Sequence, residues 1–332
     1  MVRKFTVIVC EVDPDSLVAG ALLGRAEEGR SEALVTRSER LASFFEPAVQ
    51  ARLPRGYDLV LCGLRVVPSD WDGRSVRPGL MDALRRFVGR IQWFGSGEWD
   101  AEDARAIEHL IGEDNLVLAG TGDILAGLVR QRLYGPDDHY EDRLARFAAG
   151  RLGADEERTW GRRIRSVLTA LKGDARALAS AVDALVENRL QGLIDEHGDA
   201  AERIEGDNRR VAAERTEPLR RMGDLKLVFV SIPPEQEPFW QEIGAYARAS
   251  AGAELSLCQL ADRPVLVLAR EPEVRADLQA WARYVTDTLP GVRTVDAREA
   301  VVPLVASPAV AGPAFKDEVL AAMSDGVHLL RS

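Results

Sequence analysis

The chain has 332 residues, of which 46% are hydrophobic and 29% are charged, a globular composition that excludes a disordered chain. Its 53 acidic and 43 basic side chains give a formal net charge of −10, which argues against attraction of the whole surface to nucleic acid or anionic lipid. Three separated cysteines, Cys10, Cys62 and Cys258, exclude a zinc ribbon or disulfide framework and fit a reducing compartment. No apolar run approaches the ~20 residues of a membrane span, and the run at 5–10 is too short for a signal peptide. We therefore expect a cytoplasmic protein without membrane contact.

Strand-like and helix-like patterns alternate over the first 137 residues. Short apolar, β-branched runs predict strands at 5–10, 33–36, 57–62, 90–94 and 115–119. Helical spacing predicts a first helix capped by Asp15 or Ser16, and further helices near 38–52, 80–88, 101–111 and 122–133. Five successive strand–helix units predict an α/β fold with a five-stranded, parallel, doubly wound sheet. Ligands of such sheets bind at the carboxyl ends of the strands, here the loops at 10–16, 62–72, 94–100 and 119–122.

The remaining sequence divides into a helical part and a smaller α/β part. Residues 138–222 have a helical pattern throughout, with breaks expected at Gly173, Gly192 and Gly198, and form a connector. The rest predicts strands at 225–230 and 293–296, a hairpin of 254–258 with 264–269, helices at 238–250, 278–285 and 315–323, and a loop at 304–313. The expected domains are thus 1–137, 138–222 and 223–332.

Two carboxylates follow the first expected strand, at Asp13 and Asp15. Carboxylates two residues apart at a strand-to-loop junction can converge on one cation or bracket two. The same residues, with Pro14 between them and Ser16 after them, also suit a turn and a helix cap. The residues alone leave both interpretations open.

The segment 7–23 resembles the first motif of the DHH phosphoesterases, in which an apolar strand leads into Asp-x-Asp and a helix of small residues. This group holds RecJ-type nucleases, oligoribonucleases, cyclic-dinucleotide phosphodiesterases and family II pyrophosphatases. Asp13 and Asp15 match the two aspartates, while the histidine that often precedes them is absent. The resemblance implies that the C-terminal domain binds substrate or a partner.

In the segments that correspond to the later motifs of this family, the apolar strands are expected here, but the metal-ligating residues after them are absent. Cys62 or Gly63 stands where the second motif has a metal-bridging aspartate. Gly95, Ser96 and Gly97 occupy the signature Asp-His-His positions, and Glu98 keeps the acidic neighbour. By the same resemblance, Asp137 or Asp138 corresponds to the fourth aspartate, and His139 can add a ligand if this segment folds over the strand ends. The glycine-rich loop of the C-terminal domain corresponds to residues 307–312, which include no histidine.

A two-metal phosphoesterase holds two cations roughly 3.5–4 Å apart, which takes several carboxylates or imidazoles. Asp13, Asp15, Asp137 and Asp138 leave at most one weakly bound Mg²⁺ or Mn²⁺. We therefore expect a pseudoenzyme that binds a nucleotide, a nucleic-acid end, a protein partner or a second copy of itself. The alternative is a metal-dependent phosphoesterase acting on short oligonucleotides, cyclic dinucleotides or another phosphate ester. Trp71, Trp93 and Trp99 lie near the same edge and either stack a base or pack in the core.

Overall fold

The computed structural model describes residues 4–67, 75–96, 99–120, 123–260, 263–271, 274–294, 301–307, 310–311 and 314–330. These residues form two compact units. Apart from Ser75, the described residues up to Glu202 belong to the first, and those from Arg203 onward belong to the second. The division falls inside the long helix α11 (Leu190–Arg215), so the segment expected as a connector contributes to both units.

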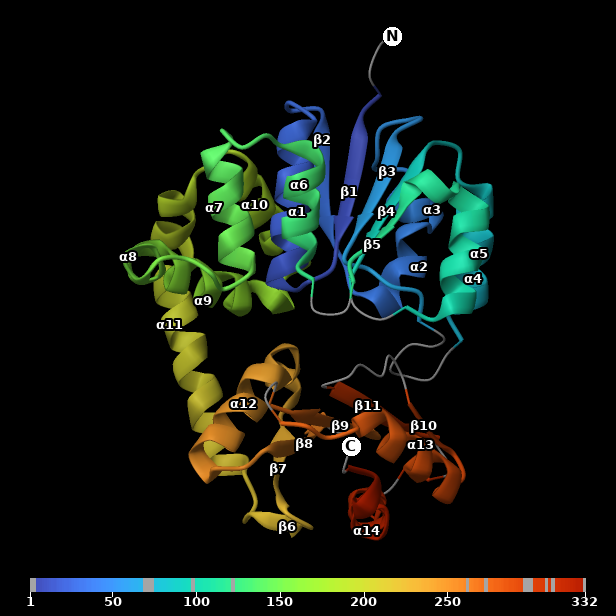
Figure 1. Ribbon diagram of the computed structural model, residues 1–332, viewed down its shortest axis with the longest axis vertical. Coiled ribbons are helices and arrows are strands. Elements are labelled where there is room, and N and C mark those ends of the chain that lie inside the picture. The colour runs from blue at the N-terminus through green and yellow to red at the C-terminus, as the bar shows by residue number, and fades with distance from the viewer. Residues whose placement is uncertain are drawn as a thin grey trace. The chain divides into compact units, whose positions relative to one another are not determined.

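The first unit contains a five-stranded sheet in which every strand pair is parallel, in the order β2-β1-β3-β4-β5 (Figure 1). Its strands are β1 (Thr6–Cys10), β2 (Ser31–Val35), β3 (Asp58–Cys62), β4 (Ile91–Gly95) and β5 (Leu116–Leu118). In register, Cys10 lies opposite Cys62, so the carboxyl ends of β1 and β3 are level. The predicted parallel, doubly wound sheet is therefore confirmed.

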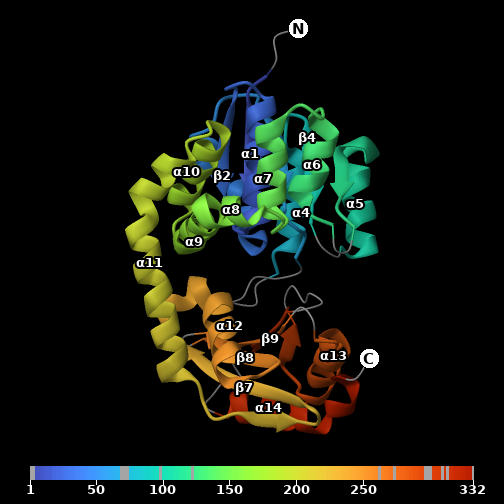
Figure 2. The ribbon, with the colours of Figure 1, turned by 60° about the vertical axis from the view of Figure 1, so that its left-hand side comes forward.

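Helices cover both faces of this sheet. One face packs against α1 (Pro14–Ala26), where Gly20 and Gly24 leave room for Ile8 and Cys10 of β1. Figure 2 shows α6, α7 and α10 beside α1 on this face. The other face buries Val7, Val9 and Trp93 against residues of α2, α4 and α5. The helices of this unit other than α1 are α2 (Leu41–Phe44), α3 (Pro47–Gln50), α4 (Arg77–Arg86), α5 (Ala101–Ile111), α6 (Leu125–Leu133), α7 (His139–Ala148), α8 (Ala154–Glu156), α9 (Arg162–Ala170) and α10 (Ala175–Val186).

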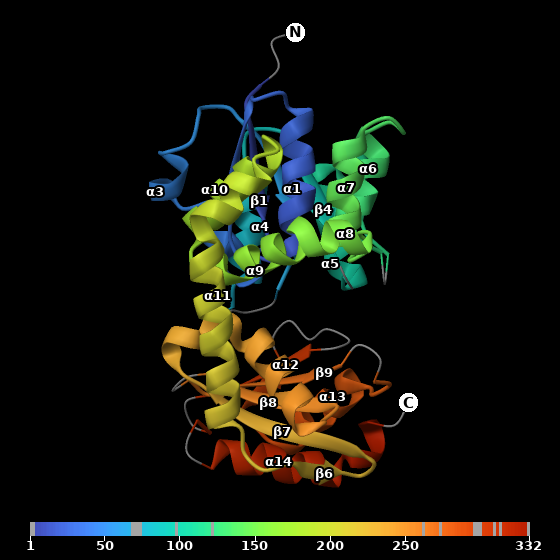
Figure 3. The same cartoon turned by 90° about the vertical axis from the view of Figure 1, so that its left-hand side faces the viewer.

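The second unit has a mixed six-stranded sheet in the order β10-β11-β9-β8-β7-β6, and Figure 3 shows β7, β8 and β9 side by side. Its elements are β6 (Arg220–Met222), β7 (Leu225–Ile232), α12 (Trp240–Ala251), β8 (Leu255–Leu260), β9 (Val265–Arg270), α13 (Leu278–Thr288), β10 (Val292–Thr294), β11 (Val301–Ala306) and α14 (Phe315–Asp325). Strands β8 and β9 pair antiparallel, which confirms the predicted hairpin.

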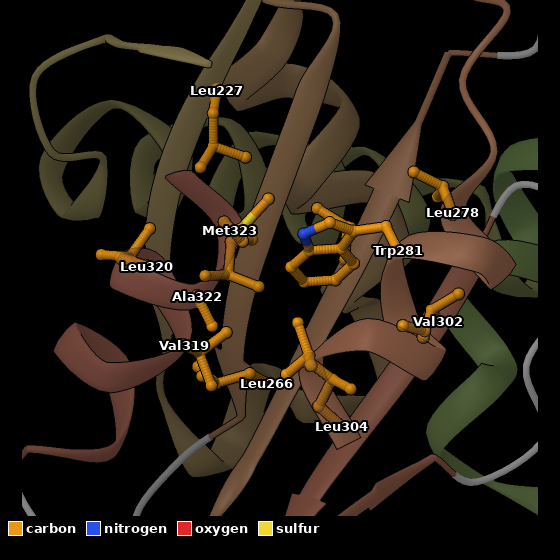
Figure 4. Packing of buried hydrophobic residues seen from close by; sticks show 14 of the residues in the cluster. Leu227, Leu266, Leu278, Trp281, Val302, Leu304, Val319, Leu320, Ala322 and Met323 are labelled. Atoms are coloured by element: carbon orange, nitrogen blue, oxygen red, sulfur yellow. The ribbon is translucent and has the colours of Figure 1, made fainter. Parts of the chain in front are cut away.

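The core of the second unit lies on both faces of its sheet. On one face, Trp281 of α13 and Met323 of α14 pack on Leu266 and Leu304 of the sheet (Figure 4). On the other face, residues of α11 and α12 cover the alternate side chains of β7, β8 and β9. Because each strand alternates its side chains between two apolar layers, this unit folds around its own hydrophobic core.

Three expectations for the helices are wrong. The helix expected at 38–52 is broken, because Glu46 precedes Pro47 and is extended, with φ −64° and ψ 142°. The helical pattern ends at Arg215 rather than near 222, since Pro218 disfavours a helical residue before it and the chain then enters β6. Gly192 and Gly198 lie inside α11 and do not break it.

The loop expected at 304–313 begins instead with a strand, because residues 301–306 form β11 despite Pro303. The Ala306 N–H donates to Pro264 O on the β9 side, so the backbone nitrogen of Pro303, three residues earlier, faces away from β9. The described part of β10 pairs only as far as Leu304. Proline therefore removes no hydrogen bond from these described pairs. Among the described residues, no helix is both long enough and apolar enough to span a bilayer.

Candidate functional site

Asp13 lies at the carboxyl end of β1 and caps α1. Its carboxylate accepts hydrogen bonds from Ser16 N at 3.0 Å and from Ser16 Oγ at 2.6 Å. Pro14 takes the first helical position, where its missing N–H costs nothing. The cap is thus Asp13, and the expectation of Asp15 or Ser16 in this role for α1 is wrong.

Asp15 caps a different helix, α6, which lies beside α1. Its two carboxylate oxygens accept one hydrogen bond each, from Leu125 N and Ala126 N, both at 2.8 Å. Burial raises the pKa of Asp15 to about 6, and the charge of Asp13 also raises it, against the lowering effect of the two backbone N–H groups. Each oxygen of this carboxylate therefore already accepts one N–H group of α6, and each keeps one further lone-pair site.

Gly63, one of the two residues expected at the position of a bridging aspartate, has no room for a side chain. Its φ is +74°, and a Cβ built on it would lie 1.7 Å from Ser16 Oγ and 2.4 Å from Ser16 Cβ. The neighbouring Cys62 is fully buried, its thiol donates to Ser16 O at 3.5 Å, and burial raises its pKa well above the usual value. A protonated, buried thiol is a poor metal ligand.

The signature positions are packed in the same way. A Cβ on Gly95 would lie 2.7 Å from both Trp99 Nε1 and Leu118 Cδ2. Ser96 Oγ donates to Gly63 O at 3.1 Å, which ties the ends of β3 and β4 together. Gly97 and Glu98 lie outside the described residues.

Of the three tryptophans near this edge, Trp71 also lies outside the described residues. Trp93 is fully buried and donates from its indole N–H to Leu64 O at 2.8 Å, so it is a core residue. Trp99 packs edge-on against Trp93, with ring centroids 5.2 Å apart. In the part of the chain described here, the buried indole N–H of Trp99 has no hydrogen-bond partner.

Asp137 and Asp138 do not join Asp13 and Asp15. They precede α7, whereas Asp15 binds the opposite end of α6, nine helical residues earlier. Asp138 accepts from Gly135 N at 2.6 Å within this turn, and Figure 1 shows the turn at the far end of the sheet from the carboxyl ends of its strands. His139 begins α7 there. The correspondence of Asp137 or Asp138 to a fourth metal ligand is therefore wrong in this fold.

Sequence reasoning missed Glu11, which follows β1 directly and is 6% exposed. Its carboxylate accepts from Ser38 N at 2.8 Å and Ser38 Oγ at 2.6 Å, and Ser38 Oγ in turn accepts from Arg65 N at 3.0 Å. The signal was an acidic residue at the very end of a continuous apolar strand. This network joins the loops after β1, β2 and β3 along the carboxyl edge.

No family model matches the chain, and no curated protein sequence matches it either. Solved structures do resemble it. A DHH-domain member of the s1p family of ribosomal proteins has a TM-score of 0.66 at 13% identity, over 99% of this chain and 88% of that one. The exonuclease RecJ bound to manganese has a TM-score of 0.58 at 13% identity, over 98% and 92%. RecJ with Mn²⁺ from Thermus thermophilus has a TM-score of 0.56 at 13% identity, over 97% and 52%.

The fold is that of the DHH-domain proteins. Two of these neighbours hold manganese, so the carboxyl edge of the first sheet of this chain can be tested for its fit to metal ions. Among the described residues, no group of three or more His, Cys, Asp or Glu side chains is arranged to hold one ion. Asp15 already accepts two N–H groups of α6, and Gly63 and Gly95 have no space for side-chain ligands. The described part of the carboxyl edge of the first sheet does not fit a two-cation centre.

Proposed function

We propose that this chain is a non-catalytic DHH-fold protein that binds a nucleotide or a nucleic-acid end at the carboxyl edge of its first sheet. The observation that carries the proposal is the crowding at Gly63, where Ser16 fills the place of a bridging carboxylate. Without that bridge, two cations cannot be held at the separation of roughly 3.5–4 Å that in-line displacement needs.

The side chains around this edge favour binding of a phosphate. Arg37 and Arg40 lie in the first five residues after β2 and are half-buried and exposed, respectively. In the part of the chain that the structure describes, neither guanidinium has an ion pair or a hydrogen bond. Arginine binds phosphate through paired N–H donors without any metal. Ligands of open parallel sheets also bind at this edge.

Binding of a 5′-phosphorylated oligonucleotide, measured by fluorescence anisotropy, tests the proposal together with a hydrolysis assay in Mn²⁺. We expect binding, no turnover, and at least about tenfold weaker affinity in the Arg37→Ala/Arg40→Ala variant. Arg105→Ala, on the exposed surface of α5, serves as the control and leaves the affinity unchanged.

The competing function is a metal-dependent phosphoesterase acting on short oligonucleotides, cyclic dinucleotides or another phosphate ester. Turnover in Mn²⁺ that Asp13→Ala abolishes would establish this function and overturn the proposal. Elemental analysis of the purified protein adds an independent readout, because a tightly held pair of cations per chain would also overturn the proposal. Equal affinity of the wild type and the double arginine variant would reject the assignment of the edge to phosphate.

A further inference from the structure

A pocket of about 580 Å³ lies in the first unit, away from the carboxyl edge. Its walls come from the segment between α3 and β3 and from α4 with the residues that follow it. Tyr57 directly precedes β3, and Val88 lies shortly before β4, so the pocket is at the amino ends of these strands. The lining residues are Phe45, Gln50, Leu53, Pro54, Arg55, Gly56, Tyr57, Gly79, Asp82, Ala83, Arg86, Phe87 and Val88.

The floor of the pocket is aromatic and held in place by fixed contacts. The Phe87 ring packs edge-on against Tyr57, with centroids 5.2 Å apart, and against Phe45 at 6.3 Å. Tyr57 Oη donates to Gln50 Oε1 at 2.8 Å, and Gln50 Nε2 donates to Phe44 O at 2.7 Å. The apolar floor is thus formed before any ligand arrives, which lowers the entropic cost of binding.

The rim combines an exposed apolar residue with arginines that have no partner. Val88 is 87% exposed, the most exposed large hydrophobic residue among those described. Arg55 and Arg86 are exposed, and within the described residues neither guanidinium forms an ion pair or a hydrogen bond. An apolar cavity whose rim carries unused cationic donors matches a ligand that is both apolar and anionic.

The charge around the pocket is positive, whereas the net charge of the chain is negative. Segments 45–58 and 79–90 contain five arginines and three carboxylates, whereas the whole chain has 53 acidic and 43 basic side chains. A local positive surface on a chain of net charge −10 attracts negatively charged ligands and orients them.

We propose that this pocket binds an acidic peptide segment of a partner protein. One bulky apolar side chain of the peptide fills the aromatic floor, and flanking carboxylates pair with Arg55 and Arg86. This inference is independent of the proposed nucleotide-binding function, because the two surfaces lie at opposite ends of the strands of the first sheet.

Three features favour a peptide over a nucleic acid. The aromatic rings pack against one another edge-on, and Tyr57 is only 5% exposed, so this floor is a poor platform for stacking a base. The exposed Val88 and the neighbouring Leu53 and Pro54 are aliphatic and suit a hydrophobic side chain rather than a base. The negative charge of Asp82 on the rim repels the phosphates of a nucleic acid, while a peptide can place a neutral or basic residue beside it.

Selection from a display library of random twelve-residue peptides on the intact protein tests this inference. We expect the enriched peptides to share one bulky apolar residue flanked by Asp or Glu. A synthetic peptide of that consensus should bind Arg55→Glu/Arg86→Glu at least about tenfold more weakly than the wild type, since both attractions become repulsions. Gly79→Trp should also abolish binding, because a Cβ on Gly79 meets nothing within 4 Å and the indole can fill the pocket.

Arg105→Glu/Arg132→Glu is the matched control, since it makes the same two charge changes at exposed arginines of the first unit that do not line the pocket, and it should retain most of the affinity. A selection without such a consensus, or a consensus peptide that binds both pocket variants as it binds the wild type, would overturn the inference. Binding of oligo(dT) that the same two variants abolish would assign the pocket to nucleic acid instead. Far-ultraviolet circular dichroism of each variant shows that a loss of binding does not come from unfolding.

Discussion

The two ends of the first sheet differ in how their charged side chains are paired. At the carboxyl ends of the strands, Glu11, Asp13 and Asp15 are all engaged with backbone N–H groups or hydroxyls of the chain itself. At the amino ends of β3 and β4, a preformed apolar pocket opens to solvent between Arg55 and Arg86. The acidic groups at the carboxyl end bind the chain itself, while Arg55 and Arg86 at the amino end have no partner within the described residues.

This difference shows how carboxylates at the end of a parallel sheet can serve the fold itself. Carboxylates near the end of a parallel strand lie close to helix N-termini, whose free N–H groups attract negative charge. When metal ligands are absent, the same carboxylates remain useful as caps, and small residues allow the loops to pack closely. The DHH fold is therefore retained here although Gly63 and Gly95 leave no space for ligands.

The largest expected effect comes from Gly63→Ala, compared with Gly29→Ala. Both glycines have positive φ, +74° and +79°, but the added Cβ clashes with Ser16 only at Gly63 and meets nothing within 4 Å at Gly29. We expect a loss of unfolding free energy of about 1 kcal/mol for Gly29→Ala and at least about 3 kcal/mol for Gly63→Ala. Hydrogen exchange of peptides from β1 and β3 measures the first unit separately from the second. Equal losses would show that the carboxyl end is not crowded.

The second effect concerns Asp15 as a cap rather than a metal ligand. Asp15→Ala leaves the N–H groups of Leu125 and Ala126 without their acceptor and should cost about 1 kcal/mol of stability. Millimolar Mn²⁺ and a chelator should leave the unfolding of wild type and variant unchanged. If Mn²⁺ stabilises the wild type but not Asp15→Ala, Asp15 is a metal ligand and the contrast between the two ends fails.

A third effect is the pH dependence that Asp15 introduces. Its pKa in the folded state, about 6, lies above its ordinary value of 3.8, so the folded protein binds the extra proton between these pH values. The stabilisation from this proton is fully present below about pH 4 and is lost as pH rises through about 6. Wild-type stability relative to Asp15→Asn should therefore fall from about pH 4 to about pH 6.5 and remain level above it. A difference that is constant across this range would contradict the raised pKa.

Most of the fold can be predicted because its determinants are local. Continuous apolar runs at 7–10 and 59–62, with helical spacing between them, indicate buried parallel strands. The predictions fail where the local signal misleads: Pro303 is typical of a loop, yet its nitrogen faces away from β9 and the strand continues through it. Gly192 and Gly198 favour breaks, yet both lie inside α11.

The site is predictable only in part, because its contacts are long-range. The Asp-x-Asp pattern correctly places Asp13 and Asp15 at the carboxyl end of the sheet. That Asp15 binds the N-terminus of α6, 110 residues later, depends on how α1 and α6 pack, which no local pattern specifies. The pocket also brings together segments 45–57 and 79–88, whose sequences show no motif.

The smallest expected effect lies at the amino end of the sheet, and it separates a binding surface from a structural one. Arg55 and Arg86 are exposed and have no partners among the described residues, so Arg55→Glu/Arg86→Glu should change the free energy of unfolding by less than about 0.5 kcal/mol. A comparable substitution at Arg25 is the contrasting case, because its Nε lies 2.6 Å from Glu141 Oε1, where Glu141 is buried. Removing that pair should cost several times more. Hydrogen exchange could instead show that Arg55 and Arg86 stabilise the first unit as much as Arg25 does. These arginines would then have a structural role, and their charge would no longer support peptide binding.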